Sequence, residues 1–260
     1  MRGIEDVSGS DQAVLGGAGA PIVVEALKLK KTHPGKVDVP VLFGIDLQIR
    51  AAEFVAVIGP SGSGKTTLLN LLGGLDLPTA GKVLINGVDT STLAEDDLAI
   101  LRNDEVGFIF RGRCLVDEFS CVENVLMPLI IRQGKPTDEQ WERAILLLNR
   151  VGLGDHLDKH PDEMTAGQNQ QCAIARALAH EPKIVLADEP TGDLDRRSGN
   201  RFFETMREMN RESGVAFVLV THDERLAQAA DRILLIEDGL IQTIGKDQHP
   251  PIIHRGPNQA

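Results

Sequence analysis

The residues with the clearest chemical meaning lie in the sequence GPSGSGKT, at positions 59–66. Glycines at this spacing let successive backbone N–H groups turn toward a phosphate, and a following helix adds the positive end of its dipole. Lys65 can reach terminal phosphates, and the Thr66 hydroxyl can ligate Mg²⁺. A Gly-Ser linker would not lie between a buried strand and an apolar helix, so the pattern predicts a nucleotide-binding loop. Its predicted ligand residues are Gly59, Pro60, Ser61, Gly62, Ser63, Gly64, Lys65, Thr66 and Thr67.

Two adjacent carboxylates follow another apolar run, in the sequence KIVLADEP. We assign Asp188 to the Mg²⁺ shell and Glu189 to the water that attacks the γ-phosphate, because one carboxylate can hold the metal while the other activates the water. The alternative interpretation is a pair of surface acids. His222 follows the next buried strand, and a lone histidine is more often structural than catalytic. Since parallel strands end at one edge of a sheet, we expect His222 near the γ-phosphate.

Short apolar segments define the first part of the chain. We expect strands at 22–31, 41–49 and 53–59, the last of which leads into the glycine-rich turn. A short helix at 67–75 should be stopped by its two glycines, and an Asn-Gly dipeptide predicts a hairpin over 79–90.

The rest of the chain has a helical pattern of apolar residues first, followed by further predicted strands. Residues from about 93 to 179 are mostly helical in pattern, and one helix there should end at Gly152. Two buried strands then end at the acidic pair and at the histidine, and a hairpin over 231–245 closes the core. This alternation predicts an α/β fold with a parallel sheet and one nucleotide site along its edge.

Composition limits the class of protein. The chain has 260 residues, is 42% hydrophobic and has a formal charge of −11. A duplex-binding protein needs a basic face, so we expect no nucleic acid partner. No apolar run approaches the ~20 residues that cross a bilayer, so we expect a soluble chain that acts at a membrane only through a partner. Three cysteines without metal-ligand spacing indicate small core residues in a reducing compartment.

The two ends of the chain differ in amino-acid composition from its middle. Residues 1–20 are rich in Gly and Ser and have no signal-peptide pattern, so we expect a flexible tail. Residues 21–245 should form the folded domain, and the proline-bearing residues 246–260 a loose C-terminal tail.

Residues 160–195, HPDEMTAGQNQQCAIARALAHEPKIVLADEPTGDLD, resemble a known family. They are similar to the signature motif, connecting helix, Walker B strand and D-loop of ABC transporter ATP-binding subunits, in order and spacing. Four separated motifs agree, and the resemblance covers nearly all of residues 21–245. The sequences NLLGGLDLPTAGKVLINGVD and LADEPTG look most like the branch that serves lipoprotein-releasing and macrolide-export transporters.

The resemblance implies a P-loop NTPase with a RecA-like parallel sheet core, an N-terminal antiparallel β subdomain and an α-helical signature subdomain at about 93–179. Two copies would bind two ATP molecules and Mg²⁺ head to tail, with loop 59–66 of one copy facing the signature of the other. ATP would close the pair and hydrolysis would open it. The implied signature and D-loop residues are Thr165, Ala166, Gly167, Gln168 and Asp195.

The resemblance also implies a partner and a location. The opening and closing would be transmitted to a membrane permease through a groove beside residues 108–125. The chain would then lie on the cytoplasmic face of the membrane as a transport motor, for export or for lipoprotein release.

Four positions depart from the family pattern. The family's glutamine that touches Mg²⁺ and the attacking water is Arg111 here, and a guanidinium cannot ligate a cation, although it can turn away or grip a phosphate oxygen. Ala166 adds a Cβ to the signature, at roughly 1 kcal/mol or more if the position requires a positive φ. Gln171 replaces a common arginine, and His33 falls where an aromatic residue stacks on adenine.

Several functions therefore stay open beside an active transport motor. Arg111 and Ala166 allow a regulatory subunit that binds ATP but hydrolyses it slowly, or they represent neutral drift. A soluble ABC-type factor acting on ribosomes or DNA usually fuses two such domains or inserts a long coiled coil, and this chain has neither. A small-molecule phosphotransferase would have no use for the sequences TAGQ and TGDLD.

Overall fold

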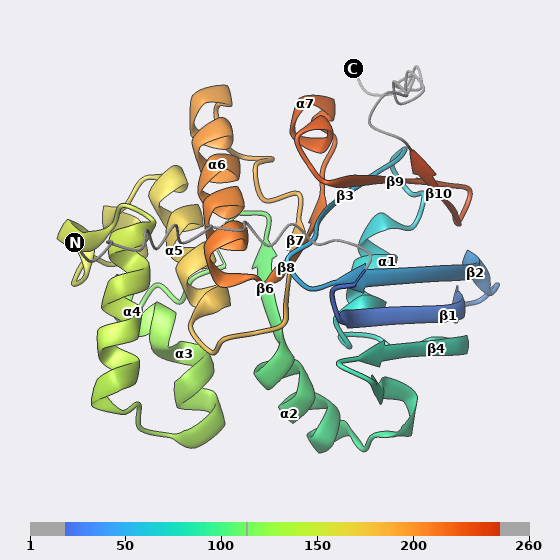
Figure 1. The fold of residues 1–260 in the computed structure, drawn as a ribbon, viewed down its shortest axis with the longest axis horizontal. Coiled ribbons are helices and arrows are strands. Elements are labelled where there is room, and N and C mark those ends of the chain that lie inside the picture. Colours follow the sequence, from blue (N-terminus) through green and yellow to red (C-terminus); the bar gives the residue numbers. More distant parts are fainter. Residues whose placement is uncertain (1–18, 113, 245–260) are drawn as a thin grey trace, which may run out of the picture.

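The computed structural model describes residues 19–112 and 114–244, and Figure 1 gives their arrangement. The tails expected at 1–20 and 246–260 lie outside the described residues, apart from residues 19 and 20. The centre is a six-stranded sheet of order β10-β9-β3-β8-β7-β6, in which only β9 and β10 pair antiparallel. Its strands are β3 Phe54–Ile58, β6 Val106–Phe110, β7 Ile184–Asp188, β8 Ala216–Val220, β9 Arg232–Glu237 and β10 Leu240–Ile244.

The central strand β3 is buried on both faces. Phe54, Ala56 and Ile58 pack into a core shared with the helices, while Val55 and Val57 pack into a second core shared with an antiparallel sheet. Successive side chains of a strand point to opposite faces, so a strand between two cores reads as an uninterrupted apolar run. This confirms the expected parallel α/β core. The helices α1 Lys65–Leu72, α6 Arg196–Ser213 and α7 Glu224–Gln228 follow β3, β7 and β8.

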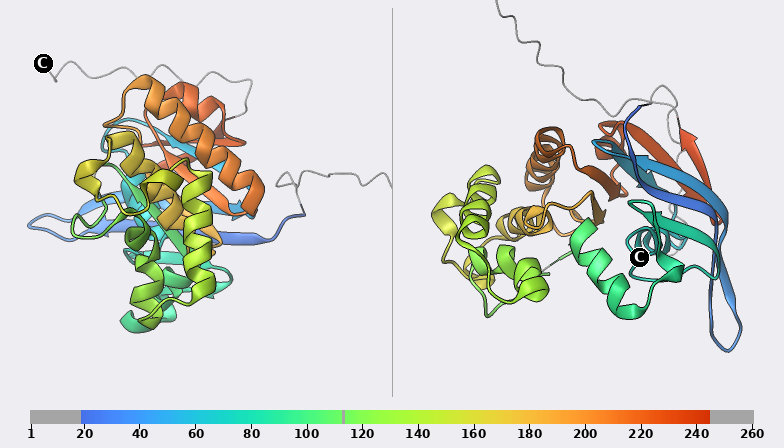
Figure 2. Two further views of the ribbon diagram at one scale, coloured as in Figure 1. Left: turned by 90° about the vertical axis from the view of Figure 1, so that its left-hand side faces the viewer. Right: turned by 60° about the horizontal axis from the view of Figure 1, so that its bottom comes forward.

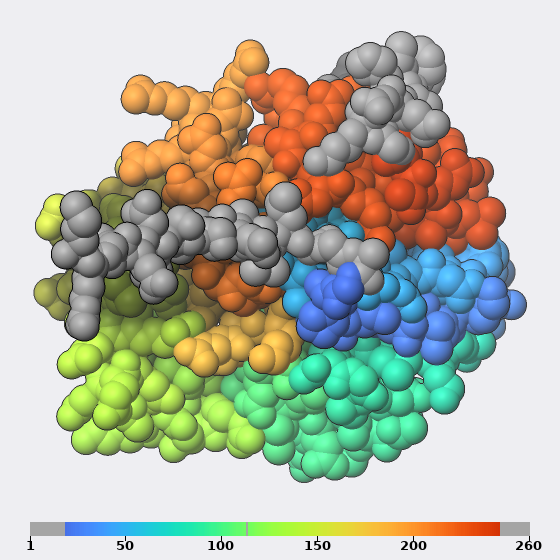
Figure 3. Space-filling view, viewed as in Figure 1, coloured from blue at the N-terminus to red at the C-terminus, as the bar shows by residue number. Residues whose placement is uncertain are grey.

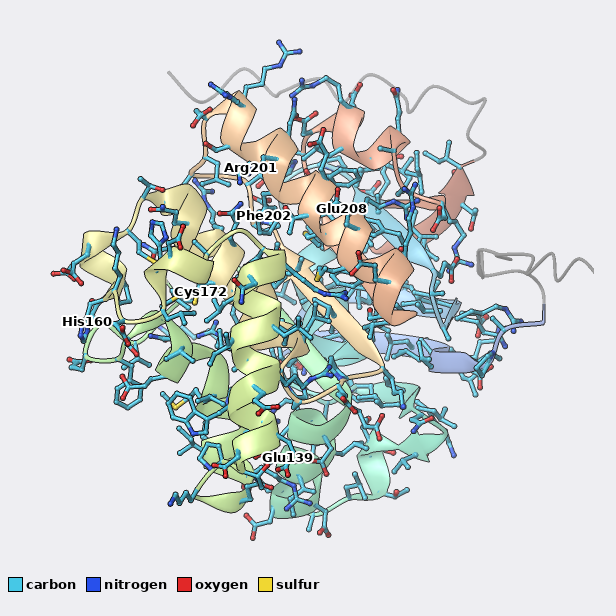
Figure 4. All side chains as sticks on the ribbon, turned by 60° about the vertical axis from the view of Figure 1, so that its left-hand side comes forward. Glu139, His160, Cys172, Arg201, Phe202 and Glu208 are labelled. Atoms are coloured by element: carbon cyan, nitrogen blue, oxygen red, sulfur yellow. The ribbon has the colours of Figure 1, made fainter. Side chains whose placement is uncertain are left out.

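Helix α6 illustrates how one face of a helix is buried. Phe202 is 1% exposed and belongs to the helical core, whereas Arg201 and Glu208 lie on the exposed face. Figure 4 labels these three residues and Cys172 of the neighbouring helix α5. The apolar positions recur at helical spacing, so α6 covers one face of the central sheet with its apolar stripe.

The second sheet has the order β2-β1-β4-β5 and is antiparallel. Its strands are β1 Ile22–His33, β2 Val39–Arg50, β4 Ala80–Ile85 and β5 Val88–Asp89. Asn86 and Gly87 join β4 to β5 with φ of 48° and 80°, as a tight hairpin turn requires, so the expected hairpin is confirmed. The Phe43 N–H donates to Gly239 O at 3.1 Å and links this sheet to the β9–β10 hairpin, and Figure 3 shows the two segments side by side.

Three further helices share the helical core with α6 and lie away from the antiparallel sheet (Figure 2). They are α3 Cys121–Gln133, α4 Asp138–Arg150 and α5 Ala166–Leu178. Each begins with a capping box, in which the side chain of the residue before the helix and that of its third residue satisfy backbone N–H groups reciprocally. Gly152, with φ of 81°, follows the end of α4 as expected.

The structure adds a strand that the sequence did not indicate. Helix α2 Glu95–Glu105 runs directly into β6, the edge strand of the central sheet, within the stretch that reads as mostly helical. A Cβ at Gly107 would lie 2.3 Å from the backbone oxygen of Ala177, so β6 approaches α5 closely. No polar turn separates α2 from β6, and a boundary without a turn leaves no local signal.

Two observations concern the cysteines and the membrane. Cys121 and Cys172 are fully buried in the helical core with their sulfur atoms 3.5 Å apart, and Cys114 is partly buried. Within residues 19–112 and 114–244, no helix combines the length and the apolar character that crossing a bilayer requires.

Candidate nucleotide-binding site

The glycine-rich loop connects β3 to α1 and lies at the carboxyl edge of the central sheet. Gly59, Gly62 and Gly64 have φ of 155°, 78° and 103°, and a Cβ at Gly59 would lie 2.1 Å from the Ile236 oxygen. Only glycine fits that close approach. The buried Ser63 hydroxyl has no hydrogen-bond partner within the described part of the chain, which suits a loop shaped to receive an external acceptor.

Lys65 folds back over this loop. Its Nζ donates to the Gly59 and Pro60 oxygens at 3.0 and 2.7 Å, and the residue is 6% exposed. Burial lowers the pKa of Lys65 below its ordinary value, while the charges of Glu189 and Asp188 act in the opposite direction. The ammonium is therefore held in a partly desolvated position beside the backbone groups expected to hold phosphate, where it interacts strongly with anions.

Thr66 and Asp188 converge from α1 and β7. The Thr66 hydroxyl donates to Asp188 Oδ2 at 3.0 Å, and Asp188 Oδ1 is buried with no partner among the described residues. Burial raises the pKa of Asp188, the Thr66 hydrogen bond opposes this, and the charge of Glu189 adds to it. A hydroxyl and a carboxylate are oxygen ligands of the kind that Mg²⁺ prefers, and the orphaned Oδ1 leaves a lone pair for it.

These two ligands suit a cation that also binds phosphate. No cluster of three or more His, Cys, Asp or Glu side chains able to hold a metal occurs in the described ranges. Mg²⁺ typically uses one or two protein ligands together with phosphate oxygens and water. The donors present therefore fit a nucleotide-bound Mg²⁺.

Glu189 and His222 meet at the ends of β7 and β8. His222 Nε2 lies 2.6 Å from Glu189 Oε1, and the Glu189 N–H donates to Val220 O at 3.0 Å. Glu189 has φ of 44°, a left-handed conformation that is unusual for this residue type. Backbone strain of this kind is common at functional sites, where surrounding contacts hold it in place.

Arg111 extends from the end of β6 toward the same carboxylate. Its Nε and Nη2 donate to Asp193 Oδ1 at 3.1 and 2.9 Å, and its Nη1 lies 3.7 Å from Glu189 Oε2. The hydrogen bond and charge of Asp193 raise the pKa of Arg111 further above its ordinary value, so it stays a cation. Sequence reasoning did not single out Asp193, because no local pattern indicates that its partner is an arginine 82 residues earlier in the chain.

His33 ends β1 beside the loop. Its Nε2 lies 3.4 Å from the Thr67 hydroxyl oxygen. This position brings the imidazole of the antiparallel sheet to the start of α1, next to the residues expected to hold phosphate.

The four signature residues form the amino end of α5. The Thr165 hydroxyl accepts from the Gln168 N–H at 3.2 Å, and Gln168 Oε1 accepts from the Thr165 N–H at 2.8 Å. Thr165 and Ala166 are exposed, and Gly167 faces Ser198 of α6. Ala166 is the first helical residue and is not among the described residues with positive φ, so the condition for a strain of roughly 1 kcal/mol is not met.

Asp195 caps the next helix, α6. Its carboxylate accepts from the N–H groups of Arg197 and Ser198 at 2.9 and 3.1 Å and from the Ser198 hydroxyl at 2.6 Å. These hydrogen bonds, the Ser198 hydroxyl first, lower the pKa of Asp195. In the single chain the residue therefore stabilises the start of α6.

A groove of about 530 Å³ lies between α2, β6 and α3. Phe108, Phe110 and Cys114, from the segment 108–125, line it, together with the exposed Ile131. Aromatic and aliphatic side chains dominate its walls, as is usual for docking surfaces.

Comparison with known proteins agrees with this geometry. Residues 42–192 match the family described as ABC transporter. A lipoprotein-releasing system ATP-binding protein of Rhodopseudomonas palustris is 49% identical over 79% of this chain and 91% of its own length. A macrolide export ATP-binding/permease protein of Syntrophobacter fumaroxidans is 46% identical over 85% of this chain, which spans 31% of that longer protein.

Solved structures give the same result. A dimeric ATP-binding cassette in a post-hydrolysis state, bound to ADP and phosphate, superposes with a TM-score of 0.78 at 36% identity, over 86% of this chain and 99% of that one. Its nucleotide-containing dimer is a property of that protein. The chain belongs to the ABC transporter ATP-binding family, and it has the P-loop NTPase fold.

We expect Asp188→Asn to raise the free energy of unfolding at neutral pH and to abolish Mg²⁺-dependent ATP binding. Because burial raises the folded pKa of Asp188 above its ordinary 3.8, the folded chain binds this proton more tightly than the unfolded chain. The contribution of Asp188 to the free energy of unfolding therefore falls as pH rises through its folded pKa. The neutral amide of the variant does not titrate, so its contribution does not change with pH. Urea unfolding of both proteins, at pH values from below 3.8 up to 7, measures the difference in their free energies of unfolding. This difference should shrink toward acid pH, and a variant less stable than wild type at pH 7 would contradict the prediction.

Proposed function

We propose that this chain is the ATP-hydrolysing motor subunit of a membrane transporter, and that it works as a head-to-tail pair. The observation that carries the proposal is the convergence of Lys65, the Thr66–Asp188 hydrogen bond and the Glu189–His222 contact at one sheet edge. Each pair joins residues distant in the sequence, and together they supply phosphate binding, metal ligation and water activation.

The proposed roles follow from the atoms that face the loop. Lys65 and the loop N–H groups bind and orient the phosphates, and Thr66 and Asp188 hold Mg²⁺, which when bound neutralises phosphate charge. Glu189 orients the attacking water and accepts its proton. His222 contacts Oε1 of Glu189 and keeps this carboxylate in place.

The second copy would complete each site through α5. Thr165 and Ala166 are exposed at the amino end of a 13-residue helix, where backbone N–H groups and the helix dipole favour an anion. We infer that this end faces the γ-phosphate bound by the other copy, so ATP adds contacts that exist only in the closed pair. Asp195, which caps α6, accepts a hydrogen bond from Ser198, and Ser198 in turn faces Gly167 of the signature.

The groove between α2, β6 and α3 is the proposed permease contact. It is lined by Phe110, the last residue of β6, and Arg111 follows directly, so movement at the groove can reach the site through adjacent residues. The chain would lie at the cytoplasmic face of a membrane through this contact. The names of the relatives favour lipoprotein release or macrolide export as the process served.

A second candidate, an ATP-binding subunit that hydrolyses slowly, is favoured by Arg111. Its guanidinium lies 3.7 Å from the carboxylate proposed to activate water. A fixed cation there would compete with the attacking water and would repel a Mg²⁺ held by Thr66 and Asp188. Ala166 gives this candidate less support, because it adopts helical geometry without positive φ.

We expect Glu189→Gln to lower steady-state ATPase activity by about 10² to 10⁴-fold, because a general base contributes that much. Binding would persist, so gel filtration with ATP and Mg²⁺ should yield a stable dimer. Glu204→Gln, on the exposed face of α6, is the control and should leave both measurements unchanged. A Glu189→Gln protein that stays monomeric with ATP would refute the paired mechanism.

We expect Ile131→Glu to weaken association with the permease by about tenfold or more, because a charge placed in an apolar contact must be desolvated. Ile131 is 72% exposed at the groove, so the chain should fold and bind ATP normally. Leu146→Glu, on α4 and 54% exposed, is the matched control outside this groove. Co-purification from membranes measures the loss, and equal retention of both variants would argue against this contact.

We expect Arg111→Gln to increase the ATPase rate of the purified complex by about twofold or more, since a cation leaves the catalytic carboxylate. Arg132→Gln removes an arginine of similar exposure from α3 and is the control. An unchanged rate would rule out slowed hydrolysis and leave the fully active motor.

A further inference from the structure

Arg111 connects three elements that are far apart in the sequence. Its side chain reaches Asp193, in the turn that precedes α6, and Glu189, at the end of β7. Its own backbone lies in the loop after β6. One guanidinium, with donors fixed in a plane, therefore faces two carboxylates at once.

The backbone around Arg111 is itself held by α5. Gln170, 4% exposed in that helix, donates its side-chain amide toward Phe110 O at 3.2 Å and Gly112 O at 3.4 Å. Both residues flanking Arg111 are thus contacted by one buried side chain. A shift of α5 would move the base of the arginine.

The opposite end of the contact is closely packed. A Cβ at Gly192 would lie 2.8 Å from Arg111 Nε, so the side chain lies directly over the turn's backbone. Within this turn, the Gly192 N–H donates to Glu189 O at 3.0 Å and the Leu194 N–H donates to Thr191 O at 3.1 Å. These two amides are direct reporters of whether the turn is closed.

We propose that Arg111 is a positioning residue, which ties Glu189 and the turn 190–194 to helix α5. Its Nε and Nη2 donate to Asp193 and its Nη1 faces Glu189, so the guanidinium acts on two carboxylates. Movement of α5, which carries the signature residues, releases the turn and the carboxylate together. The role of Glu189 as water activator rests on the proposed function, whereas the restraint is a property of the chain alone.

Amide hydrogen exchange of the nucleotide-free full chain tests the restraint. Arg111→Ala and Asp193→Ala should each raise exchange at the Gly192 and Leu194 amides by about two- to fivefold, because a half-exposed ion pair stabilises only modestly. The double variant should match Arg111→Ala, since Asp193→Ala removes only a contact that Arg111→Ala already removes. Unchanged exchange in Arg111→Ala, or effects that add, would overturn the proposal.

Salt gives an independent measurement on the same samples. Raising NaCl from about 0.05 to 1 M shortens the screening length from about 14 to 3 Å, so wild-type exchange at these amides should approach that of Arg111→Ala. The variant itself should respond little. Arg132→Ala, which breaks the Arg132–Asp104 pair of 2.8 Å and similar exposure, is the matched control and should not affect the turn.

A third variant tests whether Gln170 connects the loop around Arg111 to α5. Gln170→Leu keeps the side-chain volume and removes the donor, so exchange at the same two amides should rise. If it does not, α5 has no part in the restraint. Because these measurements use no nucleotide and no permease, they can succeed while the transport proposal fails, and the dimer test of Glu189→Gln can succeed while the restraint fails.

Discussion

The parallel alignment of β3, β7 and β8 is the constraint on which the rest of the structure depends. Val57 and Asp188 both pair with Val220, so three strands end at the same level of one sheet edge. The glycine-rich loop, the acidic pair and His222 each follow one of these ends. Parallel strands leave their polar continuations on a common edge, and crossover helices must return on the sheet's faces. The order and direction of the strands therefore bring the residues of the site together.

Burial on both sides of this sheet sets the electrostatics of that edge. Two cores enclose the strands, so the first polar groups beyond them, Lys65 and Asp188, are partly removed from water. Each shifts its pKa toward the neutral form because of that burial. Desolvation of this kind costs stability in the nucleotide-free chain, and it strengthens the attraction for a phosphate or a cation. The strained left-handed backbone of Glu189 has the same location.

Helix α5 connects the signature residues to the loop around Arg111. Its exposed amino end carries Thr165 and Ala166, its middle carries Gln170, which holds the loop around Arg111, and its other end packs against β6 at Gly107. If its amino end faces the second copy as proposed, this helix can relate events there to events at the catalytic edge, which its side contacts. The groove between α2, β6 and α3, which we propose as the permease contact, is bordered by β6 as well. Glu189 therefore has two neighbours of different origin, His222 from the core sheet and Arg111 from the α5-linked loop.

The sequence by itself determined the nucleotide loop, the strand ends and the family, because each is encoded by local spacing. Glycines before Lys65, an apolar run before Asp188 and an Asn-Gly turn at Asn86 need no distant partner to be recognised. Tertiary structure alone decided which carboxylates Arg111 would meet, that Ala166 would begin a helix without positive φ, and that Val106–Phe110 would form the edge strand. Those outcomes depend on pairs such as Arg111 and Asp193, 82 residues apart, and on strand pairing with β7. A local pattern cannot specify a contact whose other half lies elsewhere in the chain.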